Sequence, residues 1–246
     1  HTGIAVEATS YSDFETDLQR HVQQDRPPDI ALVPQPATVA SYARDGELVD
    51  LSGYLDPEVV REQLSDHLVS LGTMAADGTW PSDAASIYGL PIRVSTKSTV
   101  WYSIPAFEAA GYEIPRTYEE LVTLTERIAA DGRTPWCHGE GSGGASGWPG
   151  TDVIENLLLH DSLEDYDAWL RHDLPFDSPP LQDAFQRMSR LLLEPGHVVG
   201  GRAAAATLFY GAAPAPLFDD PPGCVLYPFG TDATRWFPLG AEPGRD

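Results

Sequence analysis

The sequence predicts an α/β fold in two lobes, and three observations lead to it. In the first hundred residues, short apolar runs alternate with amphipathic helical patterns, an order typical of an α/β lobe. Helical patterns then dominate the middle of the chain, and the composition changes near residues 101–105. We therefore expect a first α/β lobe over residues 1–103 and a second, helix-rich lobe over 104–222. Residues 223–246 would form a return segment that crosses between the lobes.

The first lobe is expected to alternate strands with short helices. The alternating residues 4–8 predict a strand, and the apolar run 29–33 predicts a second, buried one. Between these strands, Ser12 and Glu15 form a capping box that begins a helix. The remaining elements expected here are helices over 38–44 and 57–72, a loop over 73–87, and extended chain over 88–94 and 98–102.

The second lobe is expected to be mostly helical. Pro105 opens a helical turn that Gly111 ends. Thr117 and Glu120 form a second capping box, and the helix that follows stops at Gly132. The remaining elements expected are helices over 152–160, 163–171 and 179–193, a helix-prone stretch over 203–210 and a β-like piece over 224–227.

The charge of the chain restricts its partners. The 246 residues carry a formal net charge of −22, and 42% of them are hydrophobic, which is enough for a sizeable core. An acidic surface repels nucleic acid and anionic lipid, so we expect neither as a partner and expect a neutral or cationic ligand. No run of apolar residues is long enough to span a bilayer.

The most informative segment is residues 137–150, a loop with six glycines, two serines, Glu140 and Trp148. Glycine lets the backbone approach a neighbouring group closely, so we expect this loop to contact a ligand beside the Trp148 ring. A generic flexible loop would have the same composition and remains the alternative.

Residues 139–144 also fit the G-x-G-x-x-G pattern of dinucleotide-binding loops. That pattern needs its last glycine inside the first turn of a helix. Here Pro149 and Gly150 intervene before the predicted helix, so we expect no cofactor.

Several single residues have both a functional and a structural interpretation. Trp148 and Asp152 suit a sugar, whose C–H face stacks on a ring while its hydroxyls bond to a carboxylate; the alternative is a tryptophan buried against the next helix. Trp101 and Tyr102 lie on an apolar strand, and core packing is the favoured role for at least one of them. Gln35 lies at a strand end, where α/β proteins place ligand groups, or is a turn residue. Lys97 is a ligand group or a solvated charge.

Sequence patterns of catalysis and metal binding are missing. The histidines are scattered, without the spacing of a metal site, and there is no G-x-S-x-G nucleophile elbow. Acidic residues are so numerous that a glycosidase pair cannot be singled out. The sequence therefore indicates binding, with no metal and no catalytic residue.

Cys137 and Cys224 do not form a C-x-x-C motif. Either they form a disulfide in an oxidising compartment or they are two buried thiols. The acidic, lysine-poor composition favours the disulfide.

Several segments carry a resemblance to a known family. The most specific are YGLPI over residues 88–92, WY at 101–102 and FEAAGY over 107–112. Further matching segments are 28–36, 97–102, 131–132, 134–137, 146–152 and 222–224. In this order they resemble bacterial ABC-transporter extracellular solute-binding proteins, in the carbohydrate-binding (maltose-binding-protein-like, family 1) class.

The resemblance implies a two-lobed, periplasmic-binding-protein-like (Venus flytrap) fold. Such proteins bind a mono- or oligosaccharide in the cleft between the lobes and deliver it to the membrane permease of an ABC importer. They are not enzymes, and they work outside the cytoplasm as periplasmic proteins or cell-surface lipoproteins; we expect a monomer. The family resemblance also implies that Cys137 and Cys224 are paired. The alternatives are a secreted glycoside-active enzyme and a binding protein for another small polar solute, such as a polyamine.

By position, the resemblance implies ligand-binding roles for residues in both lobes and in the return segment. They are Tyr11, Asp13, Gln35, Lys97, Trp101, Glu140, Trp148, Asp152 and Trp236. Proteins of this class are longer, so the resemblance further implies a fold that is incomplete at both ends. We expect the first lobe to lack its opening strand, and the chain to be part of a longer molecule.

Overall fold

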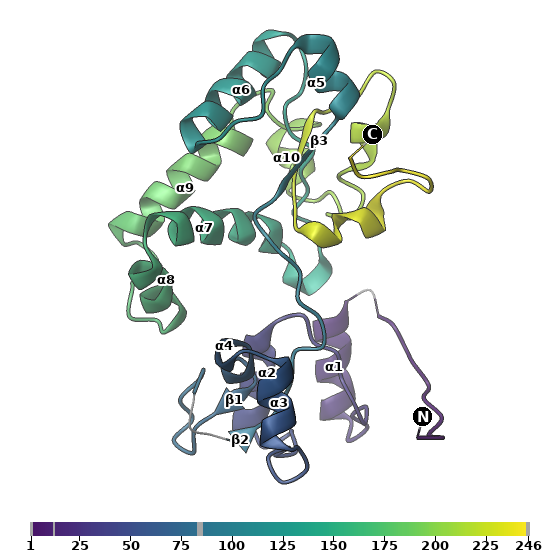
Figure 1. The fold of residues 1–246 in the computed structure, drawn as a ribbon, viewed down its shortest axis with the longest axis vertical. Helices are drawn as coiled ribbons and strands as arrows, with labels where there is room; N and C mark the ends of the chain where they lie inside the picture. The colour runs from purple at the N-terminus through teal and green to yellow at the C-terminus, as the bar shows by residue number, and fades with distance from the viewer. Residues whose placement is uncertain (1, 12, 83–85, 245–246) are drawn as a thin grey trace. The chain divides into compact units, whose positions relative to one another are not determined.

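The computed structural model describes residues 2–11, 13–82 and 86–244 (Figure 1). The chain divides into two compact units, His1–Val94 and Ser95–Asp246. This division precedes the expected change of lobe at residues 103–104, because strand β3 (Val100–Tyr102) pairs within the second unit. Residues 223–246 also belong to the second unit, since they contain β4 (Leu226–Pro228), the partner of β3.

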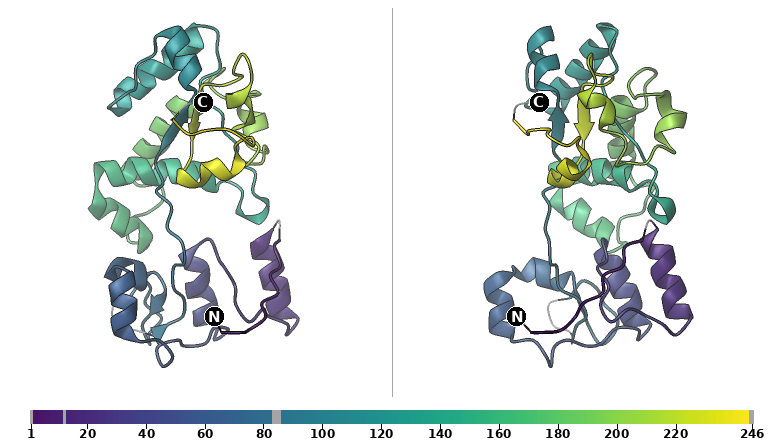
Figure 2. Two further views of the ribbon diagram at one scale, coloured as in Figure 1. Left: turned by 45° about the vertical axis from the view of Figure 1, so that its right-hand side comes forward. Right: turned by 90° about the vertical axis from the view of Figure 1, so that its right-hand side faces the viewer.

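The first unit is built from short helices and a small antiparallel sheet, which Figure 2 shows from two further sides. Thr73 pairs with Ile87 and Met74 with Ser86 in that sheet. The elements of this unit are α1 (Phe14–Gln23), α2 (Pro36–Arg44), α3 (Pro57–Gln63), α4 (Asp66–Ser70), β1 (Thr73–Met74) and β2 (Ser86–Ile87).

The two strands predicted at the start of the chain are wrong. Residues 4–8 and 29–33 form no strand, and neither segment has a backbone hydrogen bond to another strand within the described ranges. Several of their apolar side chains are exposed, among them Val6 at 85% and Ile30 at 81%. An apolar pattern indicates only which side chains a strand would bury, whereas the strand itself needs a hydrogen-bonding neighbour.

The other departures in the first unit concern where elements begin and end. The helix predicted over 57–72 is two helices, because Leu64 is extended and the Ser65 side chain caps α4 by accepting from the Leu68 amide. The predicted loop over 73–87 contains β1 and β2. Ser12 of the first capping box lies outside the described residues, and α1 begins at Phe14.

The second unit contains the longer helices and a second antiparallel pair of strands (Figure 1). In this pair Trp101 lies opposite Tyr227. The elements are β3, α5 (Ile104–Ala110), α6 (Tyr118–Ala130), η1 (Gly143–Ala145), α7 (Trp148–Asp161), α8 (Leu163–Leu170), α9 (Pro179–Leu192), α10 (Gly201–Ala205), η2 (Ala215–Phe218), β4 and η3 (Thr231–Trp236). None of the helices in the described ranges is long and apolar enough to cross a membrane.

Local signals in this unit predicted the helix ends well. Gly111 ends α5 in the left-handed conformation with a φ of 63°, as glycine after a helix usually does. Thr117 caps α6 by accepting from the Glu120 amide at 3.2 Å. The Glu120 carboxylate accepts from the Arg116 amide at 2.7 Å, one residue before the amide that a capping box normally uses. The predicted helices over 163–171 and 179–193 are α8 and α9.

The core of the second unit lies where α6 and α9 meet the β3–β4 pair. Ile128, Trp136 and Leu226 are at most 1% exposed and belong to one apolar cluster. Helix α7 packs against α9 and carries Ile154 and Leu158 into a second cluster with Leu181. This packing holds α7 rigidly within the unit.

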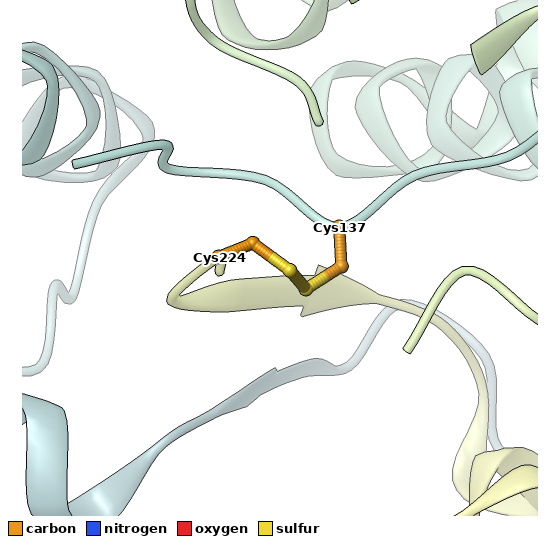
Figure 3. The surroundings of a disulfide bond; sticks show 2 residues. All are labelled: Cys137 and Cys224. Atoms are coloured by element: carbon orange, nitrogen blue, oxygen red, sulfur yellow. A yellow bond between two sulfur atoms is a disulfide. The ribbon is translucent and has the colours of Figure 1, made fainter. Parts of the chain in front are cut away.

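Cys137 and Cys224 form a disulfide, which confirms their predicted pairing. Figure 3 shows that the bond joins the start of the glycine-rich segment to the chain just before β4. Their Cα atoms are 5.5 Å apart, and both cysteines are fully buried. A backbone hydrogen bond lies beside the disulfide, in which the Cys137 amide donates to the Leu226 carbonyl at 2.8 Å.

Replacing both cysteines by alanine should destabilise the second unit. The bridge closes a sequence separation of 87 residues, for which the chain-entropy model gives at most about 4–5 kcal/mol. Urea unfolding of the double variant, compared with the oxidised parent, measures the loss. An unchanged unfolding midpoint would show that the bond contributes nothing to stability.

Candidate functional site

Two of the six glycines in the glycine-rich loop pack against residues 207–208 of the same chain, whereas the expected contact of the loop with a ligand stays a prediction. The Gly141 amide donates to the Leu208 carbonyl at 2.8 Å, and the Gly141 carbonyl accepts from Tyr210. A Cβ atom on Gly139 would lie 2.7 Å from the Leu208 carbonyl oxygen, and one on Gly141 would lie 2.6 Å from that of Thr207. These two glycines are therefore needed for close backbone packing with residues 207–208.

Helix α7 begins earlier than predicted, at Trp148 rather than after Gly150. Pro149 therefore lies in the first turn, where a missing amide hydrogen costs nothing. Gly150 is also helical, whereas Gly144, the last glycine of the G-x-G-x-x-G pattern, lies in η1, four residues before α7 begins. That glycine is therefore outside the first turn of the helix, where a dinucleotide-binding loop would place it.

Three side chains follow one another along a single face of α7. Trp148, Asp152 and Glu155 are spaced at i, i+4 and i+7, which places them in one stripe. The Asp152 carboxylate accepts a hydrogen bond from Lys97 Nζ at 2.6 Å, and the Glu155 carboxylate accepts one from the Tyr166 hydroxyl at 3.2 Å. This stripe brings together an aromatic ring, two carboxylates and an ammonium group.

Lys97 reaches the stripe from the first residues of the second unit. The backbone around it is held by residues 229–231, since Thr231 N donates to Thr96 O at 2.8 Å and Phe229 N donates to Thr99 O at 3.1 Å. Lys97 Nζ also lies 5.8 Å from the centre of the Trp148 ring. The lysine side chain is 55% exposed and the Asp152 side chain 21%, so the pair lies at the protein surface.

Burial sets the protonation behaviour of the two carboxylates. Desolvation raises the pKa of Asp152, and the hydrogen bond and charge of Lys97 oppose that rise. Desolvation also raises the pKa of Glu155, again opposed by Lys97 and reinforced by Asp152. The Tyr166 hydroxyl has its pKa raised by burial and by Glu155, so it remains a hydrogen-bond donor to that carboxylate.

The Trp148 ring is half-buried against other aromatic rings. It meets Tyr210 edge-on with ring centres 4.9 Å apart and Phe229 at 5.4 Å. Tyr210 in turn meets Trp236 at 5.5 Å, so Trp148 and Trp236 contact the same tyrosine. The buried Trp236 indole nitrogen has no hydrogen-bond partner among the described residues, and it could donate to an acceptor group.

Both carboxylate oxygens of Glu140 have partners within the protein. Its Oε1 is 2.6 Å from Nε2 of His138, which is 3% exposed, and its Oε2 accepts from the Gly150 amide at 3.0 Å. Lys97 thus lies beside Trp148 and Asp152, and Trp236 is linked to Trp148 through Tyr210. Glu140 contacts the first turn of α7.

Trp101 lies apart from that group. Its indole nitrogen donates to the Gly230 carbonyl at 3.2 Å, and its ring meets Phe237 edge-on at 5.1 Å. It lines an apolar cavity of about 190 Å³ together with Phe218 and Phe237. Among the described residues, none of the other predicted site residues lines this cavity. Core packing, the alternative noted for Trp101, accounts for these contacts.

Tyr11, Asp13 and Gln35 all belong to the first unit. Tyr11 meets His21 edge-on at 5.6 Å. Asp13 and Gln35 stand at the N-caps of α1 and α2, yet neither side chain makes a capping hydrogen bond. Within the part of the chain that the structure describes, Asp13 Oδ1 and Gln35 Oε1 are buried without a hydrogen-bond partner. A ligand hydroxyl or ammonium group would satisfy either oxygen, so their ligand-binding roles stay predictions.

The described part of the chain contains no group of three or more histidine, cysteine or acidic side chains arranged to hold a metal ion. The site is therefore characterised by hydrogen-bonding groups and aromatic rings.

Comparison with known proteins identifies the family. The model of the family described as "Bacterial extracellular solute-binding protein" matches residues 1–223. The chain belongs to this family of extracellular solute-binding proteins, which confirms the resemblance found in the sequence.

Individual relatives agree with this assignment. The alpha-glucosides-binding periplasmic protein AglE of Rhizobium meliloti is 36% identical over all of this chain and 53% of its own length. The osmoprotective compounds-binding protein GgtB of Synechocystis is 37% identical over 98% of this chain and 55% of its own length. The chain thus spans about half the length of the curated relatives it matches.

Solved structures show the same fold. A chitin oligosaccharide binding protein superimposes with a TM-score of 0.71 at 20% identity, over 97% of this chain and 56% of its own. RafE in complex with raffinose superimposes with a TM-score of 0.62 at 19% identity, over 92% and 55%. The predicted α/β, periplasmic-binding-protein-like fold is confirmed.

Some residues of the site were not recognised in the sequence. Glu155 could have been found from its helical spacing to Trp148 and Asp152. Tyr166, Tyr210 and Phe229 could not, because each reaches the site from a different segment through tertiary packing.

Replacing Lys97 by methionine should raise the pKa of Asp152 further, because the lysine is what opposes desolvation. A carboxylate with a raised pKa binds a proton more readily in the folded than in the unfolded state. The variant should therefore lose stability relative to the parent as the pH rises above the ordinary aspartate value of 3.8.

A ¹³C NMR titration of the side-chain carboxyls measures this change, with Asp152→Asn assigning the signal. Lys97→Arg is the matched control, because it keeps the positive charge. Identical Asp152 titrations in the methionine variant and the parent would show that the ion pair is not formed.

Proposed function

We propose that this chain binds a carbohydrate, a mono- or oligosaccharide, at the face formed by Trp148, Asp152 and Lys97. The observation that carries the proposal is the placement of a half-buried indole ring beside an ion pair on one helical stripe. A sugar stacks its C–H face on such a ring, and its hydroxyls donate to the carboxylate and accept from the ammonium. The other predicted contacts, Trp236 among them, would complete the site.

The relatives support a sugar as the ligand. AglE is named for alpha-glucosides, and RafE is solved with raffinose. Trp236 contacts Tyr210, which also contacts Trp148, and its buried indole nitrogen is a hydrogen-bond donor. A ring or hydroxyl oxygen of a sugar could accept that hydrogen bond. An α-glucoside is therefore the first ligand to test.

The proposed role is binding and delivery rather than catalysis. The relatives named above are binding proteins, and the carboxylates nearest the Trp148 ring are engaged by Lys97 and Tyr166. We propose that the protein works outside the cytoplasm, in the periplasm or at the cell surface, as a monomer that passes its sugar to the membrane permease of an ABC importer.

A different small polar solute is the second candidate. GgtB is named for osmoprotective compounds, and the stripe holds two carboxylates against one lysine, which would accommodate a cationic group. A response to spermidine or another amine, with silence towards sugars, would favour this candidate.

Trp148→Ala should weaken sugar binding roughly fivefold, since loss of an aromatic stacking surface removes about 1 kcal/mol of binding free energy. A thermal-shift screen of the parent with maltose, trehalose, sucrose and methyl α-D-glucopyranoside finds the ligand, because bound ligand raises the melting temperature. Calorimetric titration then compares the variant with the parent.

Trp80→Ala is the control, because Trp80 lies in the first unit and bonds to the Leu71 carbonyl. Equal affinity of Trp148→Ala and the parent for the sugar identified would contradict the proposed site. A parent that responds to none of the sugars would contradict the proposed ligand.

A further inference from the structure

Helix α7 has an N-terminus that its own N-cap residue cannot satisfy. That residue is Gly147, with a φ of 99° and no side chain to accept a hydrogen bond. Ser, Thr, Asp or Asn at the N-cap normally accepts from the amide two or three residues further on. Here the Gly150 amide donates instead to Glu140 Oε2 at 3.0 Å, from a residue in the preceding loop.

Glu140 is itself held firmly. Its backbone amide donates to the Ala205 carbonyl at 2.9 Å, and its carbonyl accepts from the Gly147 amide at 2.9 Å. Its Oε1 lies 2.6 Å from Nε2 of the buried His138. The carboxylate therefore has a defined position before α7 begins, and the partial positive charge of the helix N-terminus favours an anion there.

A side chain at position 150 would collide with the Glu140 carboxylate. A Cβ atom on Gly150 would lie 2.7 Å from Glu140 Oε1 and 3.3 Å from Oε2. Glycine at position 150 thus lets the carboxylate sit against the first turn of α7. The same turn carries Trp148, and the next carries Asp152.

We propose that Glu140 is a positioning residue: it caps α7 from the loop and so sets the Trp148 ring and the Asp152 carboxylate at the sugar-binding face, without contacting the sugar. This role replaces the direct ligand contact expected for Glu140, because both of its carboxylate oxygens are engaged within the protein. The effect of Glu140 on sugar affinity rests on the proposed function. Its effect on the position of the Trp148 ring does not depend on that function.

The test that needs no ligand is acrylamide quenching of tryptophan fluorescence in the whole chain. Glu140→Ala should increase the quenchable fraction of the emission and shift the emission to longer wavelength, because the Trp148 ring loses its fixed packing on Tyr210 and Phe229. Placed in a Trp148→Phe background, the same substitution should change neither quantity. Glu140→Gln should restore values close to the parent's, since its amide oxygen can still accept from Gly150.

Glu120→Ala is the matched control. Glu120 also presents its carboxylate to the start of a helix in the same unit, where it accepts from the Arg116 amide. This variant should leave the Trp148 emission unchanged. If Glu140→Ala fails to fold, Gly150→Ala takes its place, because the added Cβ displaces the carboxylate while leaving it in the chain.

Two results would overturn the proposal. One is a quenching change that persists in the Trp148→Phe background, and the other is no change in Glu140→Ala relative to the parent. With the sugar identified by the thermal-shift screen, Glu140→Ala should bind more weakly than the parent, because the Trp148 ring and the Asp152 carboxylate are no longer held in place. If the parent binds no sugar, the proposed function fails, and the quenching comparison still decides the role of Glu140.

Discussion

The orientation of α7 is the constraint on which the candidate site depends. Its first turn is tied to the glycine-rich loop by the hydrogen bond from the Gly150 amide to Glu140, and its apolar side is buried against α9. The disulfide at Cys137 anchors the start of the same loop to β4. Because one helix carries Trp148, Asp152 and Glu155, fixing that helix fixes the relative positions of all three side chains.

Charge compensation is the second organising feature of this face. Two carboxylates whose pKa values are raised by burial lie along α7, and Lys97, the only lysine in the sequence, lowers both. The chain carries a formal net charge of −22, and Lys97 supplies the positive charge that lowers the pKa of these two carboxyls. It keeps Asp152 able to accept hydrogen bonds, which is what recognition of hydroxyl groups needs.

Local signals in the sequence predicted much of the second unit and less of the first. Thr117 with Glu120, and Gly111 after α5, act through hydrogen bonds and backbone preferences within a few residues, so they could be recognised without the fold. The alternating residues 4–8 and the apolar run 29–33 each depend on a neighbouring strand, and the structure provides none within the described ranges. The helix predicted over 57–72 failed because Ser65 caps a new helix in the middle of the apolar pattern.

For the site, the sequence by itself determined the family and, through the family resemblance, the cysteine pair. It also indicated that Trp148 and Asp152 lie near the start of a helix, but not that both belong to α7, because that helix was predicted to begin after Gly150. Tertiary structure decided which of the predicted residues meet, because Lys97, Tyr210 and Trp236 reach that face from distant segments. It also decided that Gly139 and Gly141 of the loop pack on residues 207–208 and that Glu140 caps α7. Contacts of this kind join residues far apart in the chain, and their distances follow from packing rather than from any local pattern of residues.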